Sequence, residues 1–297
     1  MTRSFDLLLT AIAPAVWGST YFVTTEYLPA GYPMTAATLR ALPAGLFLLL
    51  LVRRLPEGLW WGRALVLGAL NFSVFWAMLF VAAYRLPGGV AATVAAIQPL
   101  IVIFLARAIL GSAIRALSIL AAAAGMIGVA LLVLTPSREL DPVGVAAGLV
   151  GAASMACGTV LSRRWQPSVS PLTFAAWQLT AGGALLLPVA LLSEPPLPAL
   201  TRTNIVGFAY LCLIGAAFTY IIWFRGVSLL EPSVVASLGF LSPLTAVLLG
   251  WQVLDQRLSA MQITGMVIVV GSVWLSQRAQ NASRFVPAKI HKHHAQI

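Results

Sequence analysis

The sequence of 297 residues is poor in charge, and this shortage excludes most classes of soluble protein. Only 9% of the residues are Asp, Glu, Lys or Arg, whereas 60% are hydrophobic and the mean hydropathy is +0.94. A soluble domain has about 25% charged and 45–50% apolar residues, and a core of this length cannot hide so much apolar surface. The composition therefore excludes an ordinary cytosolic domain, a disordered chain and a disulfide scaffold, and it indicates a membrane protein.

Cysteine, histidine and lysine are also scarce. Cys157 and Cys212 lie inside apolar runs without metal-ligand spacing, so we expect buried thiols. All three histidines and both lysines follow Asn281, and we expect residues 281–297 to be a disordered tail or expression scar outside the fold. The motifs HExxH and GxxxxGK[ST] are absent, which disfavours an intramembrane enzyme and an ATPase. We expect no cofactor and no metal.

Acidic residues are missing from the middle of every apolar run. The eight carboxylates lie at the ends of runs or between them: Asp6, Glu26, Glu57, Glu139, Asp141, Glu194, Glu231 and Asp255. A carrier that exchanges cationic drugs for protons normally needs a carboxylate within the membrane, which the cation and the proton share. The sequence therefore favours a neutral or zwitterionic solute. It offers no obvious proton relay, so uniport stays open.

Ten apolar runs of about the length that a bilayer core requires follow one another with short connections. The expected spans are 5–25, 34–52, 64–84, 88–107, 116–134, 142–162, 171–192, 203–224, 233–254 and 261–277. The short connections leave no room for a soluble domain. The fold class that we expect is an all-α membrane protein with ten transmembrane helices.

The arginines between these runs indicate the orientation, because positive charge is retained on the cytoplasmic side. With the N-terminus inside, ten arginines face the cytoplasm: Arg3, Arg53, Arg54, Arg63, Arg107, Arg115, Arg163, Arg164, Arg225 and Arg278. Only Arg85, Arg138, Arg202 and Arg257 then face outward. Both termini are expected in the cytoplasm. The net charge of +10 thus reflects topology and the tail, and we expect no nucleic-acid partner.

The two halves of the chain resemble each other. The segment from Val90 to Leu100 aligns with the segment from Val234 to Leu244 at an offset of 144, and Arg85 aligns with Arg225 at an offset of 140. Five spans in each half predict two repeats of inverted topology, at 1–137 and 138–280. Many secondary transporters are built in this way, with the substrate site near the midplane between the repeats. The alternative is a duplicated helical protein without a pathway.

Several of these residues carry a family resemblance. Trp17-Gly18-Ser19, Arg40, the helices with Pro99 and Pro243, and the 5+5 duplication are similar to the EamA type of the drug/metabolite transporter superfamily. The resemblance implies a ten-helix carrier of the bacterial inner membrane with cytoplasmic termini, in which the fifth and tenth helices are scaffold. The aromatic spans also resemble bacterial exporters of aromatic and other neutral amino acids.

Polar residues in the third span are candidates for the cavity wall, because a polar group that faces lipid is costly. Asn71, Phe75 and Met78 share one face of a regular helix, and Trp76 lies beside them. This pattern predicts an amphipathic binding wall. The alternative is that Asn71 only holds two helices together by a hydrogen bond.

Prolines interrupt the fourth and ninth spans at matching depth. Pro99 and Pro243 are expected to free the carbonyl groups of Ala95 and Gly239, four residues earlier. Such carbonyls are tolerated where protein or cavity water satisfies them, so the two breaks predict a substrate region or a hinge.

Four polar residues accompany these breaks as candidate substrate contacts. Gln98 and Ser242 directly precede the two prolines, while Thr93 and Ser237 occupy equivalent positions earlier in each helix. Their amide and hydroxyl groups can pair with a carboxylate or an amine.

Aromatic and cationic residues complete the candidate site. Trp17, Trp76, Tyr220 and Trp223 lie within spans, where they either line the cavity or pack between helices. Arg40 lies inside the second span, and its counterpart in the second half is Gln178. Arg40 can bind a substrate carboxylate, contact backbone carbonyls or extend toward the membrane surface.

Together these features predict a secondary transporter, rather than an enzyme, a channel or a receptor. We expect it to export small neutral or zwitterionic metabolites by alternating access, with amino acids, including aromatic ones, as the best match. The alternative is an exporter of other metabolites or toxic organic compounds. The expected partners are the small-molecule substrate and the lipid bilayer, with the protein as a monomer or weak dimer.

Overall fold

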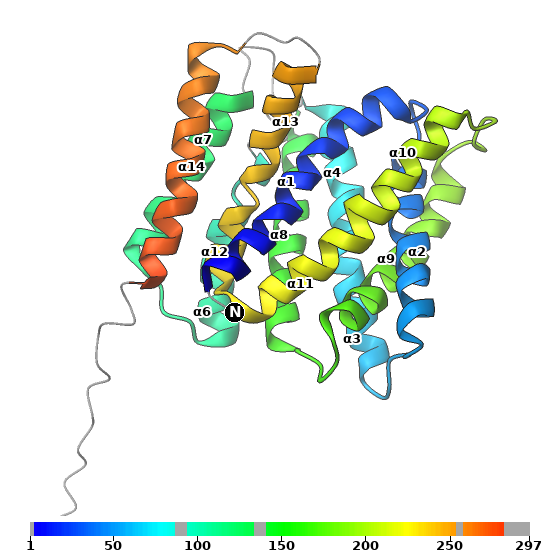
Figure 1. Ribbon diagram of the computed structural model, residues 1–297, viewed down its shortest axis with the longest axis horizontal. Coiled ribbons are helices and arrows are strands. Elements are labelled where there is room, and N and C mark those ends of the chain that lie inside the picture. The colour runs from blue at the N-terminus through cyan, green and yellow to red at the C-terminus, as the bar shows by residue number, and fades with distance from the viewer. Residues whose placement is uncertain (1–2, 87–93, 134–140, 254–257, 282–297) are drawn as a thin grey trace, which may run out of the picture.

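The computed structural model describes residues 3–86, 94–133, 141–253 and 258–281, and regular structure in these ranges is entirely helical (Figure 1). Nine helical segments there are long and apolar enough to cross a bilayer. A tenth apolar helix, Gln98–Leu110, is shorter. The predicted all-α membrane protein is confirmed, and the described helices lie at the predicted spans, although residues 88–93 of the fourth span lie outside the described residues.

The helices of the first half begin and end at residues with suitable backbone preferences. Pro33 opens its helix, where a missing N–H costs nothing, and Gly111 ends another with a φ of 70°. The elements are α1 (Arg3–Tyr27), α2 (Pro33–Val52), α3 (Trp60–Gly68), η1 (Ala69–Ser73), α4 (Val74–Arg85), α6 (Gln98–Leu110) and α7 (Ala116–Val133).

The second half starts with well-capped helices. Asp141 accepts hydrogen bonds from the backbone N–H groups of Val143 and Gly144, and Ser170 accepts one from Thr173. The elements are α8 (Pro142–Arg164), α9 (Pro171–Ser193), α10 (Arg202–Cys212), η2 (Leu213–Phe218), α11 (Thr219–Leu229), α12 (Pro232–Leu238), α13 (Leu241–Val253) and α14 (Ala260–Asn281).

A π-helical segment interrupts the third span and another interrupts the eighth. η1 begins at Ala69 and η2 at Leu213, which is the offset of 144 residues that also relates Pro99 to Pro243. π-helical turns are rare and occur mainly as bulges within α-helices, frequently at functional sites. Each bulge turns the helix beyond it to a new face.

The ninth span is broken more widely than a proline kink requires. α12 ends at Leu238, and tight turns follow before α13 begins. The Gly239 carbonyl accepts a hydrogen bond from the Ser242 backbone N–H at 3.1 Å. The prediction that this carbonyl is freed was therefore wrong, because the chain replaces the lost helical bond with a bond to the residue three positions later. The fourth span breaks similarly before α6, where the Ile97 N–H donates to the Val94 carbonyl at 3.3 Å.

The helices pack in pairs that join the two halves of the chain. α2 packs against α9 and α7 against α14, while α1 lies against α11 and α13, and α8 against α4 and α6. Figure 1 shows α7 and α14 together on one side of the bundle and α2 and α9 on the other. The start of α1 and the end of α14 lie at the same end of the bundle, which we call the terminal end; the other is the opposite end.

Glycine permits the closest of these approaches. A Cβ atom at Gly18 would overlap the carbonyl oxygen of Ser242 and would lie 2.7 Å from the Thr245 Cβ atom. α1 and α13 can therefore cross in contact only because position 18 has no side chain. The glycine of Trp17-Gly18-Ser19 thus holds the neighbouring tryptophan close to the break in the ninth span.

An ion pair joins the two halves at each end of the bundle. At the terminal end, Arg225 of α11 contacts Asp6 of α1 at 2.7 Å, with side-chain exposures of 24% and 15%. At the opposite end, Arg85 of α4 contacts Asp141 at 3.1 Å, with side-chain exposures of 50% and 32%. The two arginines align in the two halves of the chain, so an aligned residue makes an ion pair with the other half at each end.

Candidate substrate-binding site

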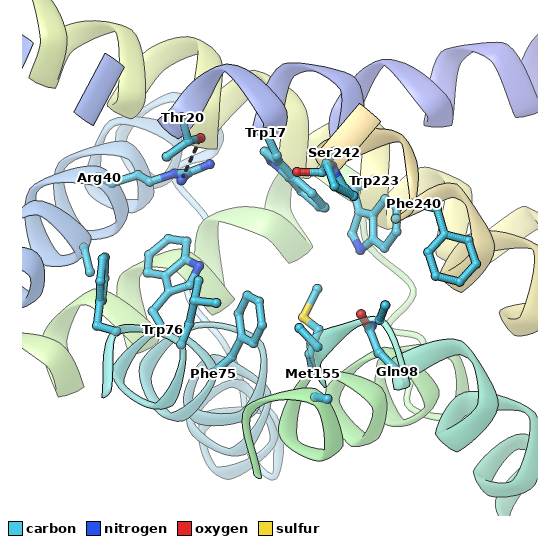
Figure 2. A pocket seen from close by; sticks show the side chains of 18 of the residues that line it. Trp17, Thr20, Arg40, Phe75, Trp76, Gln98, Met155, Trp223, Phe240 and Ser242 are labelled. Carbon is cyan, nitrogen blue, oxygen red and sulfur yellow. Dashed lines mark hydrogen bonds between the residues drawn. The ribbon is translucent and has the colours of Figure 1, made fainter. Parts of the chain in front are cut away.

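A cavity of about 390 Å³ lies in the middle of the bundle, which is a suitable size for a small-molecule ligand. Figure 2 shows side chains converging on it from opposite walls. α1, α11 and α13 supply one wall, and α4, α6 and α8 supply the other, so both halves of the chain contribute. Its aromatic lining residues are Trp17, Phe75, Trp76, Phe80, Tyr220, Trp223 and Phe240. Its polar ones are Thr20, Thr24, Thr25, Arg40, Gln98 and Ser242.

Trp17 is fixed in the wall by contacts with α11. Its indole N–H donates to Thr219 Oγ1 at 3.0 Å, and its ring centroid lies 4.9 Å from that of Tyr220 and 5.0 Å from that of Trp223. The indole N–H is therefore already used within the protein. What Trp17 presents to the cavity is a positioned aromatic surface.

Arg40 lies at one end of the cavity, beside Thr20 (Figure 2). Its Nη2 donates to the Gly215 carbonyl in η2 at 2.7 Å, and its Nη1 donates to Thr20 Oγ1 at 3.3 Å. The guanidinium also lies 5.2 Å from the centre of the Trp76 ring. The side chain keeps 9% exposure. Arg40 thus joins neighbouring helices by hydrogen bonds and also lines the cavity.

Gln98 and Ser242 lie on facing walls, away from Arg40 (Figure 2). Both residues border the helix breaks, and Pro99 and Pro243 also line the cavity. The cavity therefore has a cationic and hydroxyl-bearing end, an aromatic middle, and an amide and hydroxyl group near the breaks.

The cavity extends from mid-bundle toward the opposite end. In α1 its lining residues are Trp17, Thr20, Thr24 and Thr25, all in the half of the helix that is remote from the terminal end. Nothing charged except Arg40 lines it within the described ranges, and the same ranges hold no group of three His, Cys, Asp or Glu that suits a metal ion.

Asn71 and Gln178 lie apart from the cavity, in a cluster of their own. Asn71 Nδ2 donates to Gln178 Oε1 at 2.7 Å and to Ser162 Oγ at 3.2 Å. The two residues are 1% and 0% exposed. The predicted face of Asn71, Phe75 and Met78 assumed a regular helix, but η1 contains Asn71 and ends before Phe75, so the two side chains no longer align.

Two other predicted residues also lie elsewhere. Met78 packs with Ala82 and Ala147 between α4 and α8. Ser237 donates to the Ser233 carbonyl at 2.8 Å and to Ser276 Oγ at 3.0 Å, which ties α12 to α14. Thr93 lies outside the described residues.

The structure adds wall residues that the sequence analysis missed. Thr20 and Thr24 lie one and two turns after Trp17 on the same face of α1, a signal that the sequence did contain. Met155 and Phe240 carry no polar signal. The Phe240 ring packs against the backbone of Gly125, and only the three-dimensional arrangement reveals this contact.

Comparisons with known proteins agree with this architecture. The model of the EamA-like transporter family matches the chain twice, at residues 4–134 and 142–277. The chain is 46% identical over 274 residues to Protein PecM of Dickeya dadantii, covering 92% of each chain. It is 32% identical to the uncharacterized inner membrane transporter YedA of Escherichia coli, over 88% of this chain and 86% of YedA.

Two more distant matches extend the comparison. A probable amino-acid metabolite efflux pump of Escherichia coli is 23% identical over 91% of this chain and 94% of its own. A protein of known crystal structure superposes on this chain with a TM-score of 0.81 at 19% identity, over 95% of this chain and 99% of that chain. The superposition supports the fold alone.

Proposed function

Because the chain belongs to the EamA-like transporter family, we propose that it exports small neutral or zwitterionic metabolites, amino acids including aromatic ones, across the bacterial inner membrane. The observation that carries this proposal is the aromatic cavity at mid-bundle, built from both halves of the chain. A cavity of this size accommodates an amino acid with an aromatic side chain. The name of the distant efflux pump relative points the same way.

The arrangement of the halves supports two five-helix repeats of inverted topology, at 1–137 and 138–280. The family model matches each half separately, and π segments and helix breaks recur at matching positions. With five spans per half, the two repeats cross the membrane in opposite directions. The excess of arginines at the terminal end supports cytoplasmic termini, and the name of YedA supports the inner membrane.

This architecture supports transport by alternating access. In the structure the cavity extends toward the opposite end, so the substrate is held between walls that must part at the terminal end to complete a cycle. The breaks at Pro99 and Pro243 lie in these walls and serve as hinges. Both halves of the site come from one chain, so a monomer or weak dimer suffices.

A counterflow screen in proteoliposomes tests the proposal. Purified protein is reconstituted into liposomes, which are loaded in turn with each of the twenty amino acids and with quaternary organic cations. Saturable exchange of each compound across the liposome membrane is then measured. We expect exchange of neutral and aromatic amino acids and none of the cations, because no acidic side chain lines the described cavity. Transport of quaternary cations without any neutral amino acid would overturn the proposal.

The variant Trp17→Ala tests in the same screen whether Trp17 contributes to the site. We expect it to lose or alter selectivity while folding normally, because Trp17 forms wall surface between Tyr220 and Trp223. Trp274→Ala is the matched control, since Trp274 is 51% exposed on α14. Unchanged transport in Trp17→Ala at normal expression would remove this residue from the site.

The second candidate is an exporter of other metabolites or toxic organic compounds. The large apolar share of the lining, including Phe75, Phe80, Met155 and Phe240, favours it. In the same screen this candidate predicts exchange of apolar organic solutes and none of the amino acids.

A further inference from the structure

The charge of the cavity wall is asymmetric. Arg40 contributes a permanent positive charge, and no acidic side chain of the described ranges lines the same space. The other polar side-chain groups of the wall are the hydroxyls of threonine, serine and Tyr220, the indole N–H groups of the tryptophans and the amide of Gln98. The wall therefore distinguishes between the two charged groups of an amino acid.

Arg40 is held in place at the end of the cavity. The Gly215 carbonyl, Thr20 and the Trp76 ring fix the guanidinium at the end of the cavity. A guanidinium is planar, remains charged and matches a carboxylate through paired N–H groups. An apolar body attached to that carboxylate then extends along the aromatic middle of the cavity, past Phe75 and Trp17 (Figure 2).

An ammonium group finds no equivalent site. Only neutral oxygens are available to it, and the positive charge of Arg40 acts against it in a partly desolvated space. Two of the tryptophan rings that would attract a cation already contact protein groups: Trp17 contacts Tyr220 and Trp223, and Trp76 lies beneath Arg40.

We propose that the cavity recognises the carboxylate of an aryl or similarly apolar carboxylic acid through Arg40 and does not recognise an ammonium group. This inference rests on the proposed function and extends its substrate class to apolar organic anions. Organic acids that lack an amino group bind at least as well as the corresponding amino acids. Aromatic amines without a carboxylate bind poorly.

Three compounds of nearly one shape test this. Calorimetric binding of 3-phenylpropionate, L-phenylalanine and 2-phenylethylamine to the full-length protein in nanodiscs separates the two charged groups. We expect 3-phenylpropionate to bind as tightly as phenylalanine or more tightly, and the amine to bind at least about tenfold more weakly. An amine that binds as tightly as 3-phenylpropionate overturns the inference, as does the absence of binding by all three.

Variants test whether Arg40 causes the preference for a carboxylate. Arg40→Gln is expected to weaken 3-phenylpropionate binding by about tenfold to a hundredfold while leaving the neutral 3-phenylpropan-1-ol nearly unchanged. An equal loss for both compounds contradicts a carboxylate contact. Arg278→Gln is the matched control, because Arg278 is an exposed arginine stacked on Trp274 of α14. If Arg40→Gln does not fold, the ranking of the three compounds on the natural protein decides.

The outcome is distinct from that of the counterflow screen. Exchange of an aliphatic amino acid together with no binding of 3-phenylpropionate would leave the proposed function standing and overturn this inference. Binding of 3-phenylpropionate together with no exchange of any amino acid would support this inference and overturn the proposed function.

Discussion

Two polar clusters at matching places in the two halves of the chain differ in their relation to the cavity. Arg40 lies seven residues after the proline that begins α2, and Gln178 lies seven residues after the proline that begins α9. Arg40 donates to Gly215 in η2, and Gln178 accepts from Asn71 in η1. Gly215 and Asn71 are themselves 144 residues apart. Each side chain therefore reaches the π segment of the other half.

The Arg40 cluster, which consists of Arg40, Thr20 and Gly215, borders the cavity through Arg40 and Thr20. The Asn71 cluster, which consists of Asn71, Gln178 and Ser162, is closed, and its amides are 0–1% exposed. In η2 the glycine leaves space that the long arginine side chain fills. In η1 the Asn71 side chain fills the space itself.

The difference has a direct reading under the proposed alternating-access cycle. Under the proposed cycle the Asn71 cluster is the counterpart that opens toward the terminal end when the Arg40 cluster closes. Gln178 Nε2 is consistent with this, because it is buried with no hydrogen-bond partner within the described part of the chain. Such a group costs about 1–3 kcal/mol, which exposure to water on opening would recover.

Among the tests of this comparison, Asn71→Leu is expected to change the stability of the protein most. The substitution leaves the Gln178 amide buried without its partner and should lower the free energy of unfolding by about 3 kcal/mol. Thermal or SDS-induced unfolding in detergent measures the loss. Asn71→Leu combined with Gln178→Leu should recover much of it, because both buried amides are then replaced by apolar groups. A single variant as stable as the natural protein would mean that the Asn71 cluster is already hydrated.

A matched pair of alanine substitutions gives a smaller effect. A Cβ at Gly158 would overlap Asn71 Oδ1, whereas a Cβ at Gly215 would lie 3.5 Å from Arg40 Nη2, an ordinary contact. Gly158→Ala should cost about 1–2 kcal/mol by overpacking the closed cluster, and Gly215→Ala should be close to neutral. The melting temperatures of the two purified variants provide the measurement. Equal losses would show that the clusters are equally tight.

Substitutions in the ion pairs at the two ends of the bundle are expected to change stability least, and the change at Asp141 depends on pH. Hydrogen bonds from the Val143 N–H, together with the nearby Arg85 guanidinium, hold the pKa of Asp141 below its ordinary value of 3.8. A carboxylate with a lowered pKa adds stability above pH 3.8, and this stability disappears as the pH falls through the lowered value.

Asp141→Asn should therefore have a slightly lower melting temperature than the natural protein at pH 7, with the difference shrinking as the pH falls below 3.8 and through the lowered pKa of Asp141. Asparagine still caps α8, so the comparison isolates the charge. Asp6→Asn at the other end should cost more at pH 7, because its ion pair is less exposed. A larger loss in Asp141→Asn would reverse this ranking of the two ends.

The sequence predicted the parts of the structure that depend on local hydropathy and proline. Runs of about twenty apolar residues gave the helices, and Pro99 and Pro243 correctly indicated where two of them break. Trp17, Phe75 and Trp76 were predicted in the cavity wall and line it. These signals are readable because span length and backbone constraints act over a few residues.

The positions of Asn71 and Ser237 could not be read in the same way. Asn71 turns away from Phe75 because of η1, and a π segment leaves no trace in hydropathy. Ser237 bonds to Ser276, whose proximity depends on how α12 packs on α14. Side-chain direction within a bundle depends on such long-range packing rather than on local composition.

The π segments also set which faces of these spans point to the cavity. If η1 straightened into a regular α-helix with every residue retained, α4 would rotate by about 100° relative to α3. Phe75 and Trp76 would then leave the cavity wall although every side chain of α4 was retained. Removal of one residue from η1 would instead let a regular α-helix keep α4 in its present orientation. Relatives whose alignment has a one-residue gap inside this segment are therefore expected to present equivalent positions of α4 to their solutes.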